Sequence, residues 1–355
     1  MKQKIILTAV ILSSLLGVVE SSAQNTQSKL NMQGLKLTEE WDKTFPKSDK
    51  VNHSKITFVN RYGITLAADL YVPKTTTGEK LPAIAVSGPF GAVKEQSSGL
   101  YAQTLAERGF LTIAFDPSYT GESGGQPRYV ASPDINTEDF SAAVDYLMNR
   151  EDVDSAKVGI LGICGWGGIA IQAAINDPRI KATVASTMYD MTRVNANGYF
   201  DSENTAAQRK AKRAAMSSQR TEDYRNGTYK LGGGVIDPLP EDAPQFVKDY
   251  HAYYKTPRGY HKRSLNSNNG WNITSNLPFL NFKFFEYADE LESAVMIVHG
   301  DKAHSFYFGK DVHALLKGDN KKLVVVSGAN HTDLYDGTEI IPFDKIESFF
   351  KEYLQ

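Results

Sequence analysis

Short apolar segments alternate with amphipathic segments from about residue 55 to the C-terminus, and this alternation limits the folds open to the chain. Strands that alternate with helices form a mostly parallel sheet whose faces are covered by the helices. Eight segments have the length and apolar character of strands: Ile56–Val59, Ile64–Val72, Ala83–Ser87, Leu111–Phe115, Val158–Leu161, Ala182–Thr187, Val295–Val298 and Leu323–Val326. We therefore expect an α/β fold with a mostly parallel central sheet flanked by helices.

The alternation stops for about a hundred residues after the sixth predicted strand. A structureless loop of that length is improbable in a compact domain, so this interval is predicted to carry its own helices, near 205–220 and 243–254. We interpret it as a large, mainly helical cap at the C-terminal edge of the sheet, where open α/β sheets bind ligands. The predicted organisation is a signal peptide at 1–23, an N-terminal extension at 24–54, a core formed by 55–190 and 290–355, and a cap insertion at 191–289.

The first residues have the pattern of an export signal. Lys2 and Lys4 supply positive charge, Ile5–Val19 is apolar, and small residues end at Ala23. We expect export, to a bacterial periplasm or beyond, with no membrane insertion once the signal is removed. The formal net charge of −2 gives no electrostatic footprint for nucleic acid.

Cys164 is the only cysteine of the 355 residues, so the chain can form neither an internal disulfide nor a cysteine-based metal site. It lies in a glycine-rich turn between a predicted strand and an Ala/Ile-rich helical segment. Such a turn can expose a nucleophile, and a helix N-terminus beneath the sulfur favours its thiolate. Trp166 occupies a position where the simplest pattern has glycine, so the close helix–strand contact is expected one residue later, at Gly167. Trp166 is then a candidate substrate-binding residue.

His331 follows the last predicted strand and precedes the C-terminal helical segment, where a histidine can reach a nucleophile on the turn. The order nucleophile, acid, histidine along the chain is that of α/β-hydrolases. Asp301, after the seventh predicted strand, is the favoured acid. Asp190, after the sixth, is the alternative.

Two backbone N–H groups are needed to stabilise the negative charge that develops on a carbonyl oxygen. Gly165, directly after Cys164, supplies one. The other is expected from the loop after the strand at 83–87, where Pro89 has no N–H and Phe90 is the chosen donor. Phe90 and Gly165 are therefore the predicted oxyanion hole.

The chain resembles α/β-hydrolases of the dienelactone-hydrolase-like group, whose members use a cysteine nucleophile. The turn around Cys164, the run from Gly88 to Gln96, and the run from His331 to Tyr335 carry this resemblance, which spans 55–355 apart from the cap. It implies hydrolysis of esters, lactones or thioesters. Because dienelactone hydrolases lack so large an insertion, their substrate is not implied.

The predicted function is an exported hydrolase of a small-molecule ester, lactone or thioester, with a Cys164–His331–Asp301 triad and a covalent acyl-enzyme. Two alternatives remain open at this point: a peptidase of the same fold, and a non-catalytic binding protein that retains the fold. A redox sensor is less favoured because no second cysteine could resolve an oxidised Cys164. No metal cluster, phosphate loop or nucleotide fingerprint is recognisable, so neither a metal nor a cofactor is expected.

Overall fold

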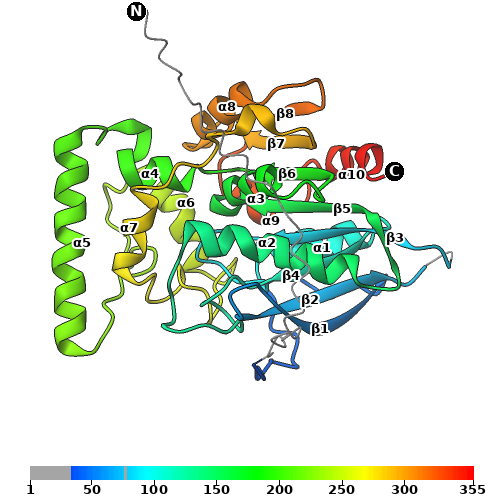
Figure 1. The fold of residues 1–355 in the computed structure, drawn as a ribbon, viewed down its shortest axis with the longest axis horizontal. Coiled ribbons are helices and arrows are strands. Elements are labelled where there is room, and N and C mark those ends of the chain that lie inside the picture. Colours follow the sequence, from blue (N-terminus) through cyan, green and yellow to red (C-terminus); the bar gives the residue numbers. More distant parts are fainter. Residues whose placement is uncertain (1–32, 76–77) are drawn as a thin grey trace, which may run out of the picture. The chain divides into compact units, whose positions relative to one another are not determined.

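The computed structural model describes residues 33–75 and 78–355, so the predicted signal peptide lies outside the described residues. Its centre is an eight-stranded sheet in the order β1-β2-β4-β3-β5-β6-β7-β8 (Figure 1). The strands are β1 Val51–Val59, β2 Thr65–Pro73, β3 Leu81–Ser87, β4 Leu111–Phe115, β5 Val153–Ile163, β6 Ala182–Ser186, β7 Ala294–Gly300 and β8 Lys321–Val326. All eight predicted strands are confirmed.

The first part of the sheet is antiparallel and the rest is parallel. β2 pairs antiparallel with both β1 and β4, whereas β4, β3, β5, β6, β7 and β8 run parallel to one another. The central strands are almost completely buried because helices cover both faces, as is usual for parallel sheets. The expected α/β-hydrolase architecture is therefore confirmed.

The chain forms ten α-helices within the described residues. They are α1 Ser97–Ala106, α2 Pro133–Met148, α3 Gly165–Asn176, α4 Met191–Asn197, α5 Ala206–Asn226, α6 Gln245–Tyr254, α7 Asn276–Phe279, α8 Phe306–Leu315, α9 Asp333–Asp336 and α10 Phe343–Tyr353. One apolar cluster packs α2 and α3 against the sheet, and a second packs α1 and α10 against it. None of the described helices has both the length and the apolar character needed to cross a membrane.

The segment between β6 and β7 carries α4 to α7 and three short 3-10 helices, at Tyr199–Asp201, Ile273–Ser275 and Ala288–Glu290. Contacts do not separate this segment from the sheet as a unit of its own. Its longest helix, α5, is mostly exposed and lies at the side of the segment away from the strands (Figure 1). The helices next to the strand ends are therefore the ones that can contribute to a site.

Five loops meet at the C-terminal edge of the parallel strands. They follow β3, β5, β6, β7 and β8, and they carry respectively Phe90, Cys164, Thr187, Ser305 and His331. Residues far apart in the sequence meet at this edge because parallel strands all end on the same side of the sheet.

Candidate active site

Cys164 lies on a sharp turn between β5 and α3, with φ 59° and ψ −127°. A non-glycine residue rarely adopts a positive φ, and such strained positions cluster at active sites. The turn depends on close backbone contact with α3: a Cβ on Gly162 would lie 2.0 Å from the Trp166 carbonyl oxygen. On Gly167 a Cβ would lie 2.7 Å from the Met188 Cβ, so close contact occurs at the expected displaced position.

The thiol of Cys164 is buried and surrounded by hydrogen-bond donors. The backbone N–H groups of Phe90 and Gly165 and the hydroxyls of Tyr335 and Tyr250 lie near the sulfur and lower the pKa of its thiol. Burial has the larger effect and raises that pKa, so the expected stabilised thiolate is not the resting state. The two predicted oxyanion donors, Phe90 and Gly165, are thus neighbours of the sulfur.

His331 is buried on the loop between β8 and α9. Its Nδ1 lies 2.6 Å from the Ser305 Oγ and 2.8 Å from the Thr187 Oγ1, and its Nε2 lies 3.0 Å from the Tyr335 hydroxyl. Burial lowers the pKa of His331 well below its usual value, helped by the nearby His304 and His299. The imidazole is therefore neutral and able to accept a proton.

Neither predicted acid contacts His331, which corrects the expected triad. One carboxylate oxygen of Asp301 accepts from the Gly328 N–H at 2.7 Å, and Asp190 caps α4 by accepting from the Thr192 and Arg193 N–H groups at 2.9 Å. Within residues 33–75 and 78–355, no hydrogen bond or ion pair joins a carboxylate to His331. The Ser305 and Thr187 hydroxyls occupy the positions at Nδ1 that an acid would take.

The expectation that Trp166 binds substrate is also wrong. Its side chain is 1% exposed and packs edge-on against Phe115 and Phe140, with ring centroids 5.7 Å and 5.4 Å away. Because consecutive residues of a helix face different directions, the indole enters the core between α2 and the sheet while Cys164 faces the opposite way. Trp166 is a core residue.

A cavity of about 240 Å³ opens above the sulfur. Five tyrosines and one phenylalanine are among its lining residues, and no Asp, Glu, Lys or Arg is among the described residues that form its walls. The lining residues are Phe90, Cys164, Tyr189, Met191, Val194, Tyr199, Gly233, Gly234, Val235, Tyr250, Tyr254, Asn266 and Tyr335. Most of them come from the segment between β6 and β7, which therefore forms part of the site.

The loop that carries Phe90 is held by that same segment. The Asn266 side-chain amide donates to the Phe90 carbonyl oxygen at 2.8 Å, and its backbone N–H donates to the Gly91 carbonyl oxygen at 3.1 Å. The Ser264 hydroxyl also donates to Gly91, at 3.0 Å. Gly91 has φ +87°, and a Cβ there would lie 2.3 Å from the Asn266 side-chain oxygen. Asn266 thereby anchors the peptide groups that follow Phe90 and holds the loop in place.

Behind the same loop lies a buried cluster of charges. Lys94 contacts Glu95, Asp116 and Glu122 at 2.7, 2.8 and 2.6 Å, with all four side chains almost completely buried. These three carboxylates lie close enough together to ligate a metal, but the Lys94 ammonium lies among them. Arg263, from the segment between β6 and β7, adds a 2.8 Å pair to Glu95. The cluster is thus internally paired.

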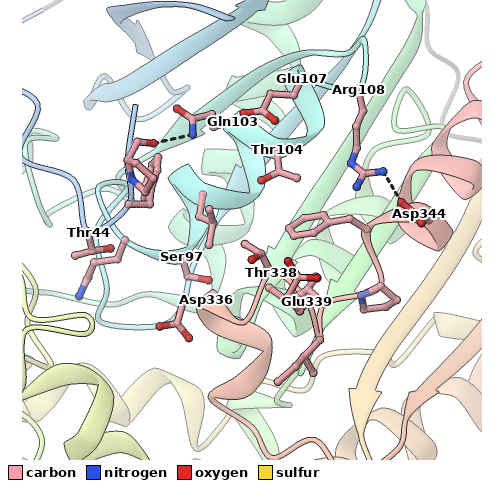
Figure 2. Close-up of a pocket in the computed structure, with 18 of the residues that line it drawn as sticks. Thr44, Ser97, Gln103, Thr104, Glu107, Arg108, Asp336, Thr338, Glu339 and Asp344 are labelled. Atoms are coloured by element: carbon pink, nitrogen blue, oxygen red, sulfur yellow. Dashed lines mark hydrogen bonds and ion pairs between the residues drawn. The ribbon is translucent and has the colours of Figure 1, made fainter. Parts of the chain in front are cut away.

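A larger groove, of about 950 Å³, lies elsewhere, between α1, residues 44–46 and residues 336–345. Figure 2 shows Arg108 paired with Asp344 at one end and Thr44, Ser97 and Asp336 at the other. Cys164 and His331 do not line it. We therefore assign the chemistry to the smaller cavity.

Four polar residues of the site were not identified from the sequence: Thr187, Tyr189, Ser305 and Tyr335. Tyr335 did have a signal, since it lies four residues after His331, one helical turn away. Thr187 and Ser305 had none, because hydroxyl residues are common in loops and only the fold brings these two to Nδ1.

Comparison with known proteins identifies the family and agrees with the fold. A family model described as X-Pro dipeptidyl-peptidase (S15 family) matches residues 62–331. The chain is 54% identical over 347 residues to the uncharacterized protein PA2218 of Pseudomonas aeruginosa, covering 97% of this chain and 92% of that protein. The solved structure of PA2218 matches with a TM-score of 0.88 over 91% of this chain and all of that chain.

Two further matches are more distant. The uncharacterized protein YcjY of Escherichia coli K12 is 35% identical, over 85% of this chain and 99% of that protein. The structure of the α/β-hydrolase GrgF from a Penicillium species has a TM-score of 0.71 at 17% identity, over 85% of this chain and 99% of that chain. At this identity GrgF supports the fold alone.

Proposed function

The chain belongs to the X-Pro dipeptidyl-peptidase (S15) family and is a hydrolase of the α/β-hydrolase type, and we propose that it cleaves a neutral ester, lactone or thioester through Cys164. The observation that carries the proposal is the thiol itself, held on a strained turn with the Phe90 and Gly165 N–H groups near it. The resemblance to dienelactone-hydrolase-like proteins, which use a cysteine, supports the same nucleophile. Export, through a signal peptide at 1–23, is part of the proposal.

The reaction has two halves. The sulfur attacks the carbonyl carbon, the thiol proton passes to neutral His331, and the carbonyl oxygen takes the electron pair while the two N–H groups stabilise it. The bond to the leaving group then breaks, and that alcohol or thiol departs with the proton from His331. Water next attacks the acyl-enzyme carbonyl and loses a proton to His331, and the returning proton regenerates the thiol as the acid is released.

The cavity supports an uncharged acyl group of limited size. About 240 Å³ corresponds to roughly eight water-sized atoms at ~30 Å³ each. The tyrosine rings offer apolar contact and their hydroxyls offer hydrogen bonds, but the lining has no charged partner for a charged acyl group. Burial of an unpaired charge there would be costly.

A peptidase, the activity named by the family description, is the second candidate. A dipeptidyl substrate brings a positively charged amino terminus, which needs a carboxylate close to the cavity. Among the described lining residues there is no carboxylate, and Asp190 is used in capping α4. We therefore place the peptidase second to the esterase or thioesterase.

Turnover of defined substrates tests the proposal. We expect the purified protein to hydrolyse p-nitrophenyl esters and acyl thioesters, with kcat/KM falling once the acyl group exceeds roughly eight non-hydrogen atoms. Cys164→Ala is expected to lose at least about a thousandfold in kcat. Efficient release of p-nitroaniline from a Gly-Pro anilide would favour the peptidase instead. Unchanged ester turnover in Cys164→Ala would overturn the proposal.

A further inference from the structure

Cys164 and His331, the nucleophile and its base in the proposed function, are joined through a third side chain. The Tyr335 hydroxyl lies 3.0 Å from the His331 Nε2, and Tyr335 lines the same cavity as Cys164, where its hydroxyl lowers the pKa of the thiol. Among the described residues, the hydrogen bonds of the imidazole run to Ser305, Thr187 and Tyr335 and not to the sulfur. Tyr335 is therefore placed beside the thiol and is bonded to the base.

Tyr335 is held firmly in this position. Its side chain is completely buried on α9, and its ring packs edge-on against Tyr253 and Tyr254, with centroids 5.0 Å and 6.2 Å away. The backbone of the same helix is fixed as well: the Ser97 hydroxyl donates to the Tyr335 carbonyl oxygen at 2.8 Å, and the Tyr101 hydroxyl donates to Leu334 at 2.7 Å. The position of the Tyr335 hydroxyl is thus fixed both by the packing of its ring and by the hydrogen bonds to the backbone of α9.

The hydrogen bonds at Nδ1 set the direction of transfer. The Ser305 and Thr187 hydroxyl oxygens at Nδ1 can each accept a hydrogen bond from the ring, and in the tautomer with the proton on Nδ1 the Nε2 is the acceptor. The chain of donors then runs from the Cys164 S–H to the Tyr335 oxygen, and from the Tyr335 O–H to Nε2. Every donor in this chain has an acceptor.

We propose that Tyr335 is a catalytic residue that relays the thiol proton of Cys164 to the Nε2 of His331. This inference rests on the proposed function and adds a participant to it. As the sulfur bonds to the carbonyl carbon, the S–H proton moves to the Tyr335 oxygen and the Tyr335 proton moves to Nε2. When the leaving group departs, it takes a proton back from this chain, so Tyr335 and His331 end as they began.

Burial gives a reason for a relay rather than a stable ion pair. It raises the pKa of Cys164 and of Tyr335 and lowers the pKa of His331, so each separated charge is disfavoured in this cavity. Moving both protons together as the sulfur attacks avoids a free thiolate or phenolate.

Tyr250 provides a matched comparison at the same sulfur. Its hydroxyl also lowers the pKa of Cys164, but its hydrogen-bond partner is the Tyr189 hydroxyl at 2.9 Å, not a nitrogen of His331. Tyr250→Phe therefore removes a hydroxyl near the thiol without breaking the link to the base. Tyr253→Phe is the structural control, because its hydroxyl has no hydrogen-bond partner among the described residues and its ring packs directly on Tyr335.

The test measures the acylation rate in single turnovers with an activated p-nitrophenyl ester. Tyr335→Phe keeps the ring and is expected to slow acylation by about 10²- to 10⁴-fold, with an unchanged melting temperature. Tyr253→Phe is expected to match wild type, and Tyr250→Phe to lose less than Tyr335→Phe. Adding His331→Ala to Tyr335→Phe should cost little more, because groups that act as one unit are not additive.

Rates in mixtures of H₂O and D₂O give a readout that a structural role would not change. Wild type is expected to show a curved dependence on deuterium fraction, from two protons in flight, and Tyr335→Phe a linear one. Acylation by Tyr335→Phe within threefold of wild type, or losses that multiply in the double variant, would overturn the relay. Wild-type protein that forms no acyl adduct at all would overturn the proposed function instead, so the two failures are distinguishable.

Discussion

Burial gives the Cys164–His331 pair a neutral resting state. Desolvation acts in opposite directions on the two groups: it raises the pKa of the thiol and lowers the pKa of the imidazole. A helix N-terminus below the sulfur favours thiolate, but two backbone N–H groups and two hydroxyls do not offset complete burial. The site therefore differs from cysteine enzymes that hold a preformed thiolate–imidazolium pair.

The pH dependence of alkylation checks this resting state. Because its pKa is raised, the thiolate fraction of Cys164 should still rise about tenfold per pH unit at pH 8.5, where a free cysteine begins to level off. Iodoacetamide reaction rates between pH 6 and 10 measure this, with glutathione as reference and Cys164→Ala as blank. A plateau below pH 8 would contradict the neutral resting state.

Among the described residues, hydroxyl groups, and not a carboxylate, lie at the His331 Nδ1. Substitutions at Ser305 and at Asp301 test whether the hydroxyls or an acid support the imidazole. Ser305→Ala removes the 2.6 Å partner of Nδ1 while Thr187 remains, so kcat/KM should fall about fivefold to tenfold, the equivalent of one hydrogen bond of ~1 kcal/mol. Asp301→Asn is the matched control and should leave ester hydrolysis unchanged. A loss of about 10⁴-fold in Asp301→Asn would restore Asp301 as the triad acid.

At this scale the sequence predicts the residues whose positions follow from the fold, and misses those that depend on loop paths. Phe90, Cys164, Gly165 and His331 were identified because each comes directly after a strand whose place in the sheet is set by topology. Asp301 and Trp166 were misassigned because a side chain's direction depends on the loop or helix turn, which strand order does not determine. The roles assigned to these residues stay proposals.

At the scale of elements, the segment 261–268 is the part of the insertion between β6 and β7 that holds the loop after β3, which carries Phe90. Asn266→Ala removes the 2.8 Å bond to the Phe90 carbonyl, so the loop that carries the Phe90 N–H loses an anchor and kcat should fall about tenfold. Asn281→Ala, at an exposed position of the same insertion, is the control. Steady-state kinetics with melting temperatures checks this, and equal kcat in both variants would show that Asn266 does not position the loop.

The strands could be predicted better than the helix ends or the insertion. All eight strands were found because apolar runs and turn residues mark them, although β1 begins at Val51, before the predicted Ile56. The early start of β1 was not predicted because the N-terminal half of this strand is partly exposed and consists mainly of polar residues. In the insertion the two main helices were predicted. The aromatic content of the sequence did not show which rings line the cavity: Tyr199, Tyr250 and Tyr254 do, while Tyr224 is exposed.

At the scale of the whole molecule, the buried charge cluster joins the sheet, the loop after β3 and the insertion. Lys94→Met would remove the cation that contacts all three carboxylates. Lys55 would still pair with Glu95 and Glu122, but Asp116 would lose its ion pair, and loss of one member of a buried ion pair costs about 3–5 kcal/mol. Urea denaturation should show a loss of this size in the free energy of unfolding. Lys351→Met, at a lysine that is 59% exposed and paired with Glu347, is the control and should cost at most ~1 kcal/mol. Equal losses would contradict a stabilising cluster.

Direct observation of an acyl group on Cys164 tests the central claim, that this fold carries a cysteine hydrolase. The protein is mixed with an activated ester of a short acyl chain, quenched in acid within the first turnover, and measured as intact protein and as peptides. The account predicts a mass increase of one acyl group in place of one hydrogen, located on the peptide that contains Cys164 and absent from Cys164→Ala. No adduct on wild type, with ester turnover unchanged in Cys164→Ala, would contradict it.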